Sequence, residues 1–291
     1  MSEFGSQNMV APLRRVLMKR PGAAMANADP DVWHYAGPLS LDQLRSDHDR
    51  FVEIIKAAGA EIVFLGDEAD ASADAVFTHD PSLVTDEGAI ILRMGKKVRR
   101  PEPECHRACF EQLGIPILGA IEEPGTVEAG DCVWLNQQTL AVGVGFRTNE
   151  SGVGQLIKLL EPLSVTVLLF DLPVGNGPDS CLHLMSVISM LDEDLALVHW
   201  PLMPVRLRRL LEDQKIEPIS APADEYDVSG SISVNALALG PRQIAMVEGS
   251  PKTIDLLRQS GCDVATFPGS ELCLKAEGGP TCLTRPILRR D

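Results

Sequence analysis

Of the seven cysteines in this chain, Cys282 has the setting that best suits contact with a ligand. It follows Gly278, Gly279 and Pro280 in the stretch GGPTCLT near the end of the sequence. Glycine lets other groups approach the backbone closely, and proline restricts the course of a turn. A cysteine that only fills a core needs neither, so we interpret Cys282 as a candidate nucleophile. Such a cysteine acts as its thiolate and needs a base or a positive charge nearby.

Among the six histidines, His183 is the best candidate for that partner. It stands at the start of the apolar run LHLMSVISM, after the Pro/Gly-rich stretch LPVGNGPDS. A polar ring that enters an apolar segment needs a hydrogen-bond partner. Taken alone, this pattern fits a satisfied core histidine better than a catalytic one, and only the carboxylates shift that balance.

Two acidic turns supply these carboxylates. Asp80 lies in FTHDPSLV after the strand-like run AVFT, with Asp74 six residues earlier, and Glu128 and Asp131 lie in VEAGDCVWL before another apolar run. Each turn alone is more typical of structure than of a site. Together with a thiol and an imidazole they suggest a planar cationic substrate, because carboxylates pair bidentately with a guanidinium. A thiolate is a suitable nucleophile for the guanidinium carbon.

An amphipathic helix followed by a break and an apolar strand recurs about every fifty residues, which indicates a repeat architecture. The five copies cover residues 51–65, 109–118, 155–170, 207–220 and 253–267. Further strand-like runs lie between them: GAIILRM, QTLAVGVG, LALVHW and RQIAMVEG. We therefore predict one α/β domain over residues 1–291, a ring of five units with helices outside. Equivalent strand ends would then converge at the centre and bring the four chemical groups into one pocket.

The composition of the chain limits the kinds of molecule that it is expected to bind. A net charge of −15 and a pI near 4.8 argue against nucleic acid and mildly favour a small cationic substrate. No apolar run is long enough for a membrane span, and the first residues do not resemble a secretory signal. We therefore expect reduced thiols and a cytoplasmic protein without a membrane partner. Cys105, His106 and Cys109 have faintly metal-like spacing, but one face of a helix explains them better, and we predict no metal site.

The segment Gly22–Leu39 has no strong periodicity and is rich in turn-forming residues. Two interpretations stay equally open: a loop that contributes to the site, and an ordinary surface connection.

The motifs FTHDPS, EAGD, VGVGFRTNESG, LHLMSVISM and GGPTCLT, in this order, resemble those of the guanidine-modifying enzymes of the pentein superfamily. Dimethylarginine dimethylaminohydrolases resemble the chain most, and arginine deiminases and amidinotransferases less. The resemblance covers nearly the whole chain. It implies a five-bladed α/β propeller of ββαβ units and a reaction that needs no cofactor.

The resemblance also implies roles for the matching residues. Cys282 would be the nucleophile, His183 the general acid and base, and Glu128 the residue that orients His183. For the substrate, Asp80 would hold the guanidinium with help from Asp74, Phe77 would line the pocket, and Arg147 would bind a substrate carboxylate, shared with Arg99 or Arg100. The implied reaction passes through a covalent thiouronium on Cys282 and releases citrulline and dimethylamine from dimethylarginine.

Three positions depart from the relatives. His79 replaces the second acidic residue that dimethylarginine hydrolases carry before the aspartate, and we expect His79 to shape the substrate pocket. Met185 and Thr281 replace an aspartate and a histidine of arginine deiminases. A smaller guanidine such as guanylurea is therefore an alternative substrate.

Amidinotransferase and arginine deiminase activities, and a catalytically inactive binding ring, are further alternatives. An inactive ring is expected to lack the cysteine and the histidine, and this chain has both. A homo-oligomer is left open.

Overall fold

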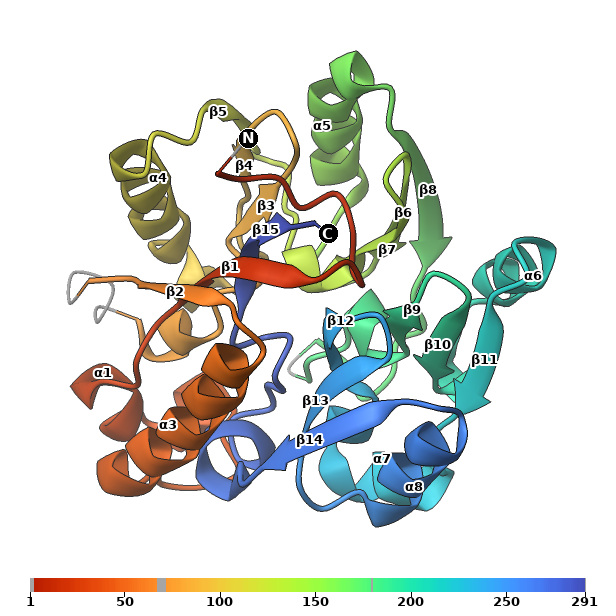
Figure 1. The fold of residues 1–291 in the computed structure, drawn as a ribbon. Coiled ribbons are helices and arrows are strands. Elements are labelled where there is room, and N and C mark those ends of the chain that lie inside the picture. Colours follow the sequence, from red (N-terminus) through yellow and green to blue (C-terminus); the bar gives the residue numbers. More distant parts are fainter. Residues whose placement is uncertain (1–2, 67–71, 179, 291) are drawn as a thin grey trace.

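Five three-stranded sheets form the framework of the protein (Figure 1). The computed structural model describes residues 3–66, 72–178 and 180–290. In spatial order, the sheets are β15 (Arg285–Arg289), β1 (Leu13–Met18) and β2 (Glu61–Phe64); β3 (Ser82–Val84), β4 (Ala89–Ile91) and β5 (Ile117–Ala120); β6 (Cys132–Asn136), β7 (Thr139–Val144) and β8 (Thr166–Asp171); β9 (Ile188–Asp192), β10 (Leu195–Val198) and β11 (Glu217–Ser220); β12 (Leu237–Gly240), β13 (Gln243–Val247) and β14 (Asp263–Phe267).

Every sheet has the same pairing, which confirms the repeat. The middle strand runs antiparallel to the first strand and parallel to the third in all five. A parallel pair needs a crossover, usually a helix. These helices are α3 (Leu41–Ala57), α4 (Glu102–Gln112), α5 (Glu150–Leu160), α6 (Val205–Asp213) and α8 (Pro251–Gln259). They lie around the outside in Figure 1, and the strands lie toward the centre. The mixed α/β fold and the five predicted helix–strand pairs are thus confirmed.

Local sequence explains these helices. The side chain of Ser40 accepts a hydrogen bond from the Gln43 amide before α3, and Asn149 accepts one from the Gly152 amide before α5. Such caps satisfy amides that have no partner within the helix. Along α3, Leu44, Phe51 and Ile55 are buried, which is the helical spacing of one apolar face.

The two ends of the chain close the ring. β15 pairs antiparallel with β1, and the amide of Gly5 donates a hydrogen bond to the carbonyl of Ile287. Both ends therefore lie close together in Figure 1. The shorter helices α1 (Ala23–Ala26) and α2 (Pro30–Trp33) lie between β1 and α3, and α7 (Ala223–Ser229) follows β11. No helix in the described part of the chain is long and apolar enough to cross a membrane.

One local prediction is wrong. The run AVFT is not a strand, because residues Ala73–Val76 form a 3₁₀ helix and the strand begins only at Ser82. A four-residue apolar run has too few residues to distinguish strand from helix by periodicity.

Turns before the first strands of the sheets carry the candidate residues. Asp80 precedes β3, Glu128 precedes β6, His183 precedes β9, and Cys282 precedes β15. Asn235 occupies the equivalent turn before β12. The fold therefore presents one polar or nucleophilic side chain from each of the five units.

Candidate active site

The candidate residues surround a small cavity of about 40 Å³. Seven of the nine predicted residues line it: Asp74, Phe77, Asp80, Arg99, Arg147, His183 and Cys282. Trp33 and His34 line it too, so the segment Gly22–Leu39 contributes to the cavity and is not merely a surface connection. A volume of this size has room for little more than a water molecule. The cavity is therefore narrow in this structure.

The two glycines before Cys282 are explained by close approach. A Cβ atom on Gly278 would lie 2.1 Å from Cε1 of Phe77, and one on Gly279 would lie 2.4 Å from Cγ of Asn235. Asn235 needs that space, because its Nδ2 donates to Cys282 Sγ at 3.2 Å and its Oδ1 accepts from the Thr281 amide at 2.9 Å. Asn235 thus fixes both the thiol and the turn that carries it.

Burial and a neighbouring charge favour the protonated form of Cys282. Burial, followed by the negative charge of Asp80, raises the pKa of the Cys282 thiol to about 12. Both effects disfavour the thiolate. A cation bound against Asp80 would remove the second effect and favour the thiolate.

His183 and Glu128 form a buried pair. His183 Nε2 lies 2.8 Å from Glu128 Oε2. Burial alone would lower the pKa of His183, but electrostatic interactions with Cys181, Asp131 and Asp80 raise it well above its usual value. Burial would likewise raise the pKa of Glu128, yet the hydrogen bond with His183 and the charge of Arg147 lower it to about 2. The geometry therefore supports an imidazolium held by a carboxylate.

The imidazole of His183 packs directly against Gly130. A Cβ atom on Gly130 would lie 2.3 Å from His183 Nδ1, a contact that real side chains do not make. The glycine of the EAGD motif is therefore required by the imidazole and not by the backbone conformation.

Asp80 is held as a charged acceptor. Its Oδ2 accepts from Arg99 Nη1 at 2.7 Å, and its Oδ1 accepts from the Gly130 amide at 3.0 Å. Burial opposes ionisation, but the charges of Arg99 and His183 lower the pKa of Asp80 far below its usual value. Arg99 also donates to both oxygens of Glu102 and to the Phe77 carbonyl. Its donors are thus committed to protein groups.

Asp74 is paired within the protein. Its Oδ2 accepts from Lys96 Nζ at 2.6 Å and its Oδ1 from the Tyr35 hydroxyl at 2.7 Å. Lys96 Nζ also donates to the Trp33 carbonyl at 2.9 Å. Asp74 therefore fastens the segment over the cavity, in addition to any contact with a substrate.

Arg147 is the second predicted arginine that the structure brings to the cavity. Its Nη1 donates to Glu128 Oε2 at 3.3 Å, and its side chain lines the cavity. Arg100 is exposed and does not line the cavity. Of the two neighbouring arginines Arg99 and Arg100, only Arg99 lines the cavity.

His79 does not line this cavity, and the expectation that it shapes the pocket directly needs correction. Its Nδ1 lies 2.9 Å from the Thr284 carbonyl, and its amide donates to the Cys282 carbonyl at 3.1 Å. The contact with the Thr284 carbonyl holds the ring of His79 away from the cavity that Asp80 lines. His79 instead joins the turn of Asp80 to the turn of Cys282.

Comparisons with known proteins agree with this geometry. The sequence model of the family "Arginine deiminase" matches residues 68–215 and 201–289. A dimethylarginine dimethylaminohydrolase of Streptomyces coelicolor is 30% identical over 280 residues, which cover 94% of this chain and 96% of that protein. The chain is a pentein-superfamily guanidine-modifying enzyme of the arginine deiminase family.

Other members of the family are more distant. An arginine deiminase of Listeria welshimeri is 28% identical over 74% of this chain, which spans 61% of that protein's length. An amidinotransferase of Microseira wollei in the saxitoxin pathway has the same fold, with a TM-score of 0.81, 17% identity and coverage of 99% and 98% of the two chains. The relatives matched by sequence are thus a dimethylarginine dimethylaminohydrolase and arginine deiminases, and the amidinotransferase shares the fold.

Sequence reasoning missed Asn235, which contacts Cys282, and the cavity residues Cys181 and Lys96 of this pentein. Asn235 could have been found by equivalence, since it precedes β12 as Cys282 precedes β15. Cys181 lies two residues before His183, and its Sγ is 3.6 Å from His183 Nδ1. Lys96 gave no signal, because its pairing with Asp74 depends on contact between distant turns.

The structure also bears on metal binding in this pentein. Among the described residues, only Asp80, Glu128 and His183 bring potential ligand atoms within 4.8 Å of one another. Arg99 and Arg147 already pair with the two carboxylates. Cys105, His106 and Cys109 lie on α4, where His106 Nδ1 contacts the Ser82 hydroxyl. The two carboxylates of the group Asp80, Glu128 and His183 therefore already have cationic partners.

Proposed function

We propose that this protein hydrolyses a guanidine C–N bond through a covalent intermediate on Cys282, with dimethylarginine as substrate and citrulline and dimethylamine as products. One observation carries the proposal: a thiol, an imidazole held by a carboxylate, and the charged Asp80 face one narrow cavity. The Streptomyces coelicolor relative, matched over nearly its whole length, supports the choice of substrate.

The proposed reaction begins when the guanidinium binds against Asp80. Its positive charge offsets the electrostatic effect of Asp80 that raises the pKa of Cys282, so the thiol releases its proton to solvent as the cation binds and the thiolate forms beside the carbon it attacks. The Cys282 Sγ–carbon bond forms and gives a tetrahedral adduct. Asn235 Nδ2, which donates to Sγ, holds the thiolate in place.

His183 then acts as acid. Glu128 occupies Nε2, which leaves Nδ1 as the atom to protonate the departing amine. Loss of the amine leaves an S-alkylthiouronium on Cys282. The neutral His183 next removes a proton from water, the water oxygen attacks the carbon, and the Sγ–carbon bond breaks to release the urea-type product.

A compact guanidine such as guanylurea is the second candidate. Lys96 neutralises Asp74, Arg99 is committed to carboxylates, and the cavity is small. These features favour a substrate with a short tail. Arg147, by contrast, is the cavity residue best able to bind a substrate carboxylate, and it favours dimethylarginine.

Mass spectrometry of the products separates the candidates. Dimethylarginine, arginine, agmatine and guanylurea are each incubated with wild type and with Cys282→Ser, with and without glycine as an amine acceptor. Citrulline and dimethylamine from dimethylarginine, absent with Cys282→Ser, is the expected result. Turnover of guanylurea alone would select the second candidate, and a glycine-dependent guanidino product would show a transferase. Equal turnover by Cys282→Ser would overturn the covalent mechanism.

A further inference from the structure

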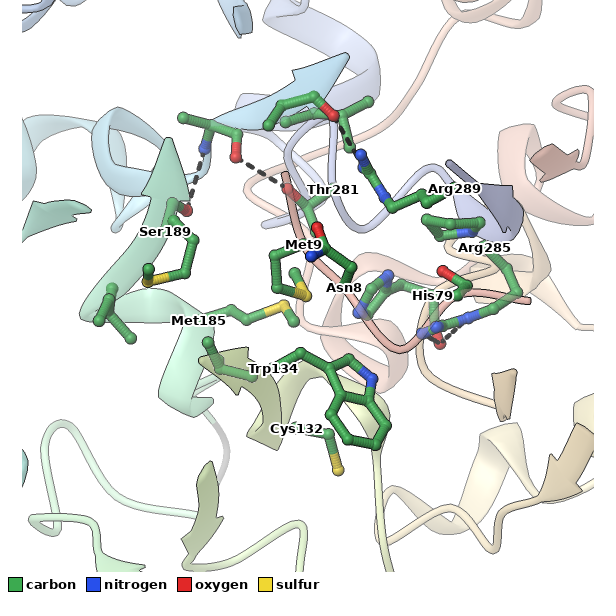
Figure 2. A pocket seen from close by; sticks show the side chains of 18 of the residues that line it. Asn8, Met9, His79, Cys132, Trp134, Met185, Ser189, Thr281, Arg285 and Arg289 are labelled. Atoms are coloured by element: carbon green, nitrogen blue, oxygen red, sulfur yellow. Dashed lines mark hydrogen bonds between the residues drawn. The ribbon is translucent and has the colours of Figure 1, made fainter. Parts of the chain in front are cut away.

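A second narrow cavity, of about 20 Å³, lies on the other side of the nucleophile's turn. His79 and Thr281, neighbours of Asp80 and Cys282 in the sequence, line it together with residues from β6, β9 and β12 (Figure 2). Arg285 and Arg289 from β15 line it as well. This inner cavity plays no part in the proposed reaction.

The inner cavity contains two buried arginines that lack an acidic partner. Arg285 and Arg289 are 3% and 6% exposed, and residues four apart on a strand lie on one face. Arg285 donates through Nε and Nη2 to the His79 carbonyl, and Arg289 donates through Nη1 and Nη2 to the carbonyls of Ala11 and Ala238. Among the described residues, no carboxylate forms an ion pair with either.

This arrangement differs from that of the other arginines in the centre. Arg99 and Arg147 are also buried, and both pair with carboxylates. Burial lowers the pKa of Arg285 to about 10 and that of Arg289 to about 9. Asp80 acts on Arg285 only from a distance, and both its oxygens already accept hydrogen bonds. Buried charges are normally paired, so these two cations require a negative charge from elsewhere.

Two buried hydrogen-bond donors also indicate that an acceptor is missing from the inner cavity. Nε of Arg289 and Nε1 of Trp134 are buried and have no hydrogen-bond partner. Both residues line the inner cavity and are shown around it in Figure 2. Guanidinium and indole nitrogens only donate, so their missing partner must be an acceptor.

We propose that the inner cavity binds a small monovalent anion of the halide class, chloride in a cell. An acceptor with negative charge satisfies the unpaired donors and offsets the two guanidinium charges. A volume of about 20 Å³ admits a water-sized species and excludes phosphate and organic acids. Water alone fits the volume but leaves both charges uncompensated.

The anion would support the active site indirectly. Arg285 holds the His79 carbonyl, and the His79 amide donates to the Cys282 carbonyl. An anion that fixes Arg285 thereby stabilises the contact between the turns that carry Asp80 and Cys282.

Crystals of the wild-type protein grown or soaked in sodium bromide test the site directly. The expected result is an anomalous bromine peak in the cavity near Trp134 and the two guanidinium groups. A cavity that holds only water at about 0.5 M bromide, well above the weak dissociation constants of the mM range, overturns the proposal.

Solution measurements test it independently through the indole N–H signal of Trp134. Sodium chloride should shift that signal saturably, sodium gluconate at equal ionic strength should not, and Trp33 and Trp200 serve as internal controls. Arg289→Gln should weaken chloride binding about tenfold or more, as loss of a charged hydrogen bond implies. Arg208→Gln, at an exposed pair on α6, should not.

The anion site can still be tested if Arg289→Gln does not fold. If Arg289→Gln fails to fold, Trp134→Phe deletes only the indole donor, and its crystals should show reduced bromide occupancy. Unchanged occupancy in Trp134→Phe and an unshifted indole signal in wild type would both contradict the site.

Discussion

Single residues in this site depend on neighbours that control their charge. Burial and the charge of Asp80 raise the pKa of the Cys282 thiol. In contrast, His183 and Arg147 lower the pKa of Glu128. The free protein thus holds a neutral thiol beside charged carboxylates. Substrate charge is the missing component that would activate the thiol, so reactivity should depend on what occupies the cavity.

The first prediction concerns the pH at which Cys282 ionises. The difference in thiolate absorbance near 240 nm between wild type and Cys282→Ser should titrate well above the ordinary cysteine value of 9.0, because both burial and Asp80 disfavour the thiolate. Asp80→Asn removes a negative charge and should lower the midpoint. A wild-type midpoint near 7 would contradict this assignment.

Among the elements of the fold, a short turn precedes the first strand of every sheet. The turns end at the first strand of each sheet, and three of them bring Asp80, His183 and Cys282 to one cavity. Glycines occur where one turn touches the next: Gly130 against His183 and Gly279 against Asn235. Packing between turns, more than the conformation of any one of them, sets the catalytic geometry.

Gly130→Ala tests that packing. The added methyl group would displace His183 and break its 2.8 Å contact with Glu128, so kcat should fall about 100-fold, as small misplacements of catalytic groups do. Gly154→Ala on α5, with no atom within 4 Å of its new Cβ, is the matched control and should retain activity. Steady-state rates of product release measure both, and thermal melts exclude unfolding. Full activity of Gly130→Ala would show that His183 tolerates displacement.

The whole molecule is a ring closed between its first and last strands. β15 carries Ile287, which is fully buried in one cluster with Leu17, Val84 and Phe110. The strand also begins three residues after Cys282. Closure of the ring and placement of the nucleophile therefore depend on the same short strand.

Ile287→Ala should lower the free energy of unfolding by about 2–5 kcal/mol, because it leaves a cavity in that cluster. Val228→Ala, at a side chain that is 90% exposed, should change it by less than about 0.5 kcal/mol. Urea unfolding followed by circular dichroism measures both. A change below about 1 kcal/mol for Ile287→Ala would show that β15 packs less tightly than its burial indicates.

The sequence by itself determined the repeating units and the residues able to do chemistry. Helical and strand periodicity are local properties, so residues 51–65 and the other four copies could be read directly, and their order predicted the fold. Cys282, His183, Glu128 and Asp80 stood out because glycine and proline surround them. The run AVFT was too short to assign in the same way.

Only the tertiary structure decided which charges meet. Lys96 and Asp74 are 22 residues apart, and Asn235 and Cys282 are 47 residues apart, so no periodicity links them. The same holds for His79, which faces the inner cavity, and for Arg285 and Arg289, which lack acidic partners in the described part of the chain. Ion pairing and burial depend on distances across the folded molecule, and these are fixed only when the five units close into a ring.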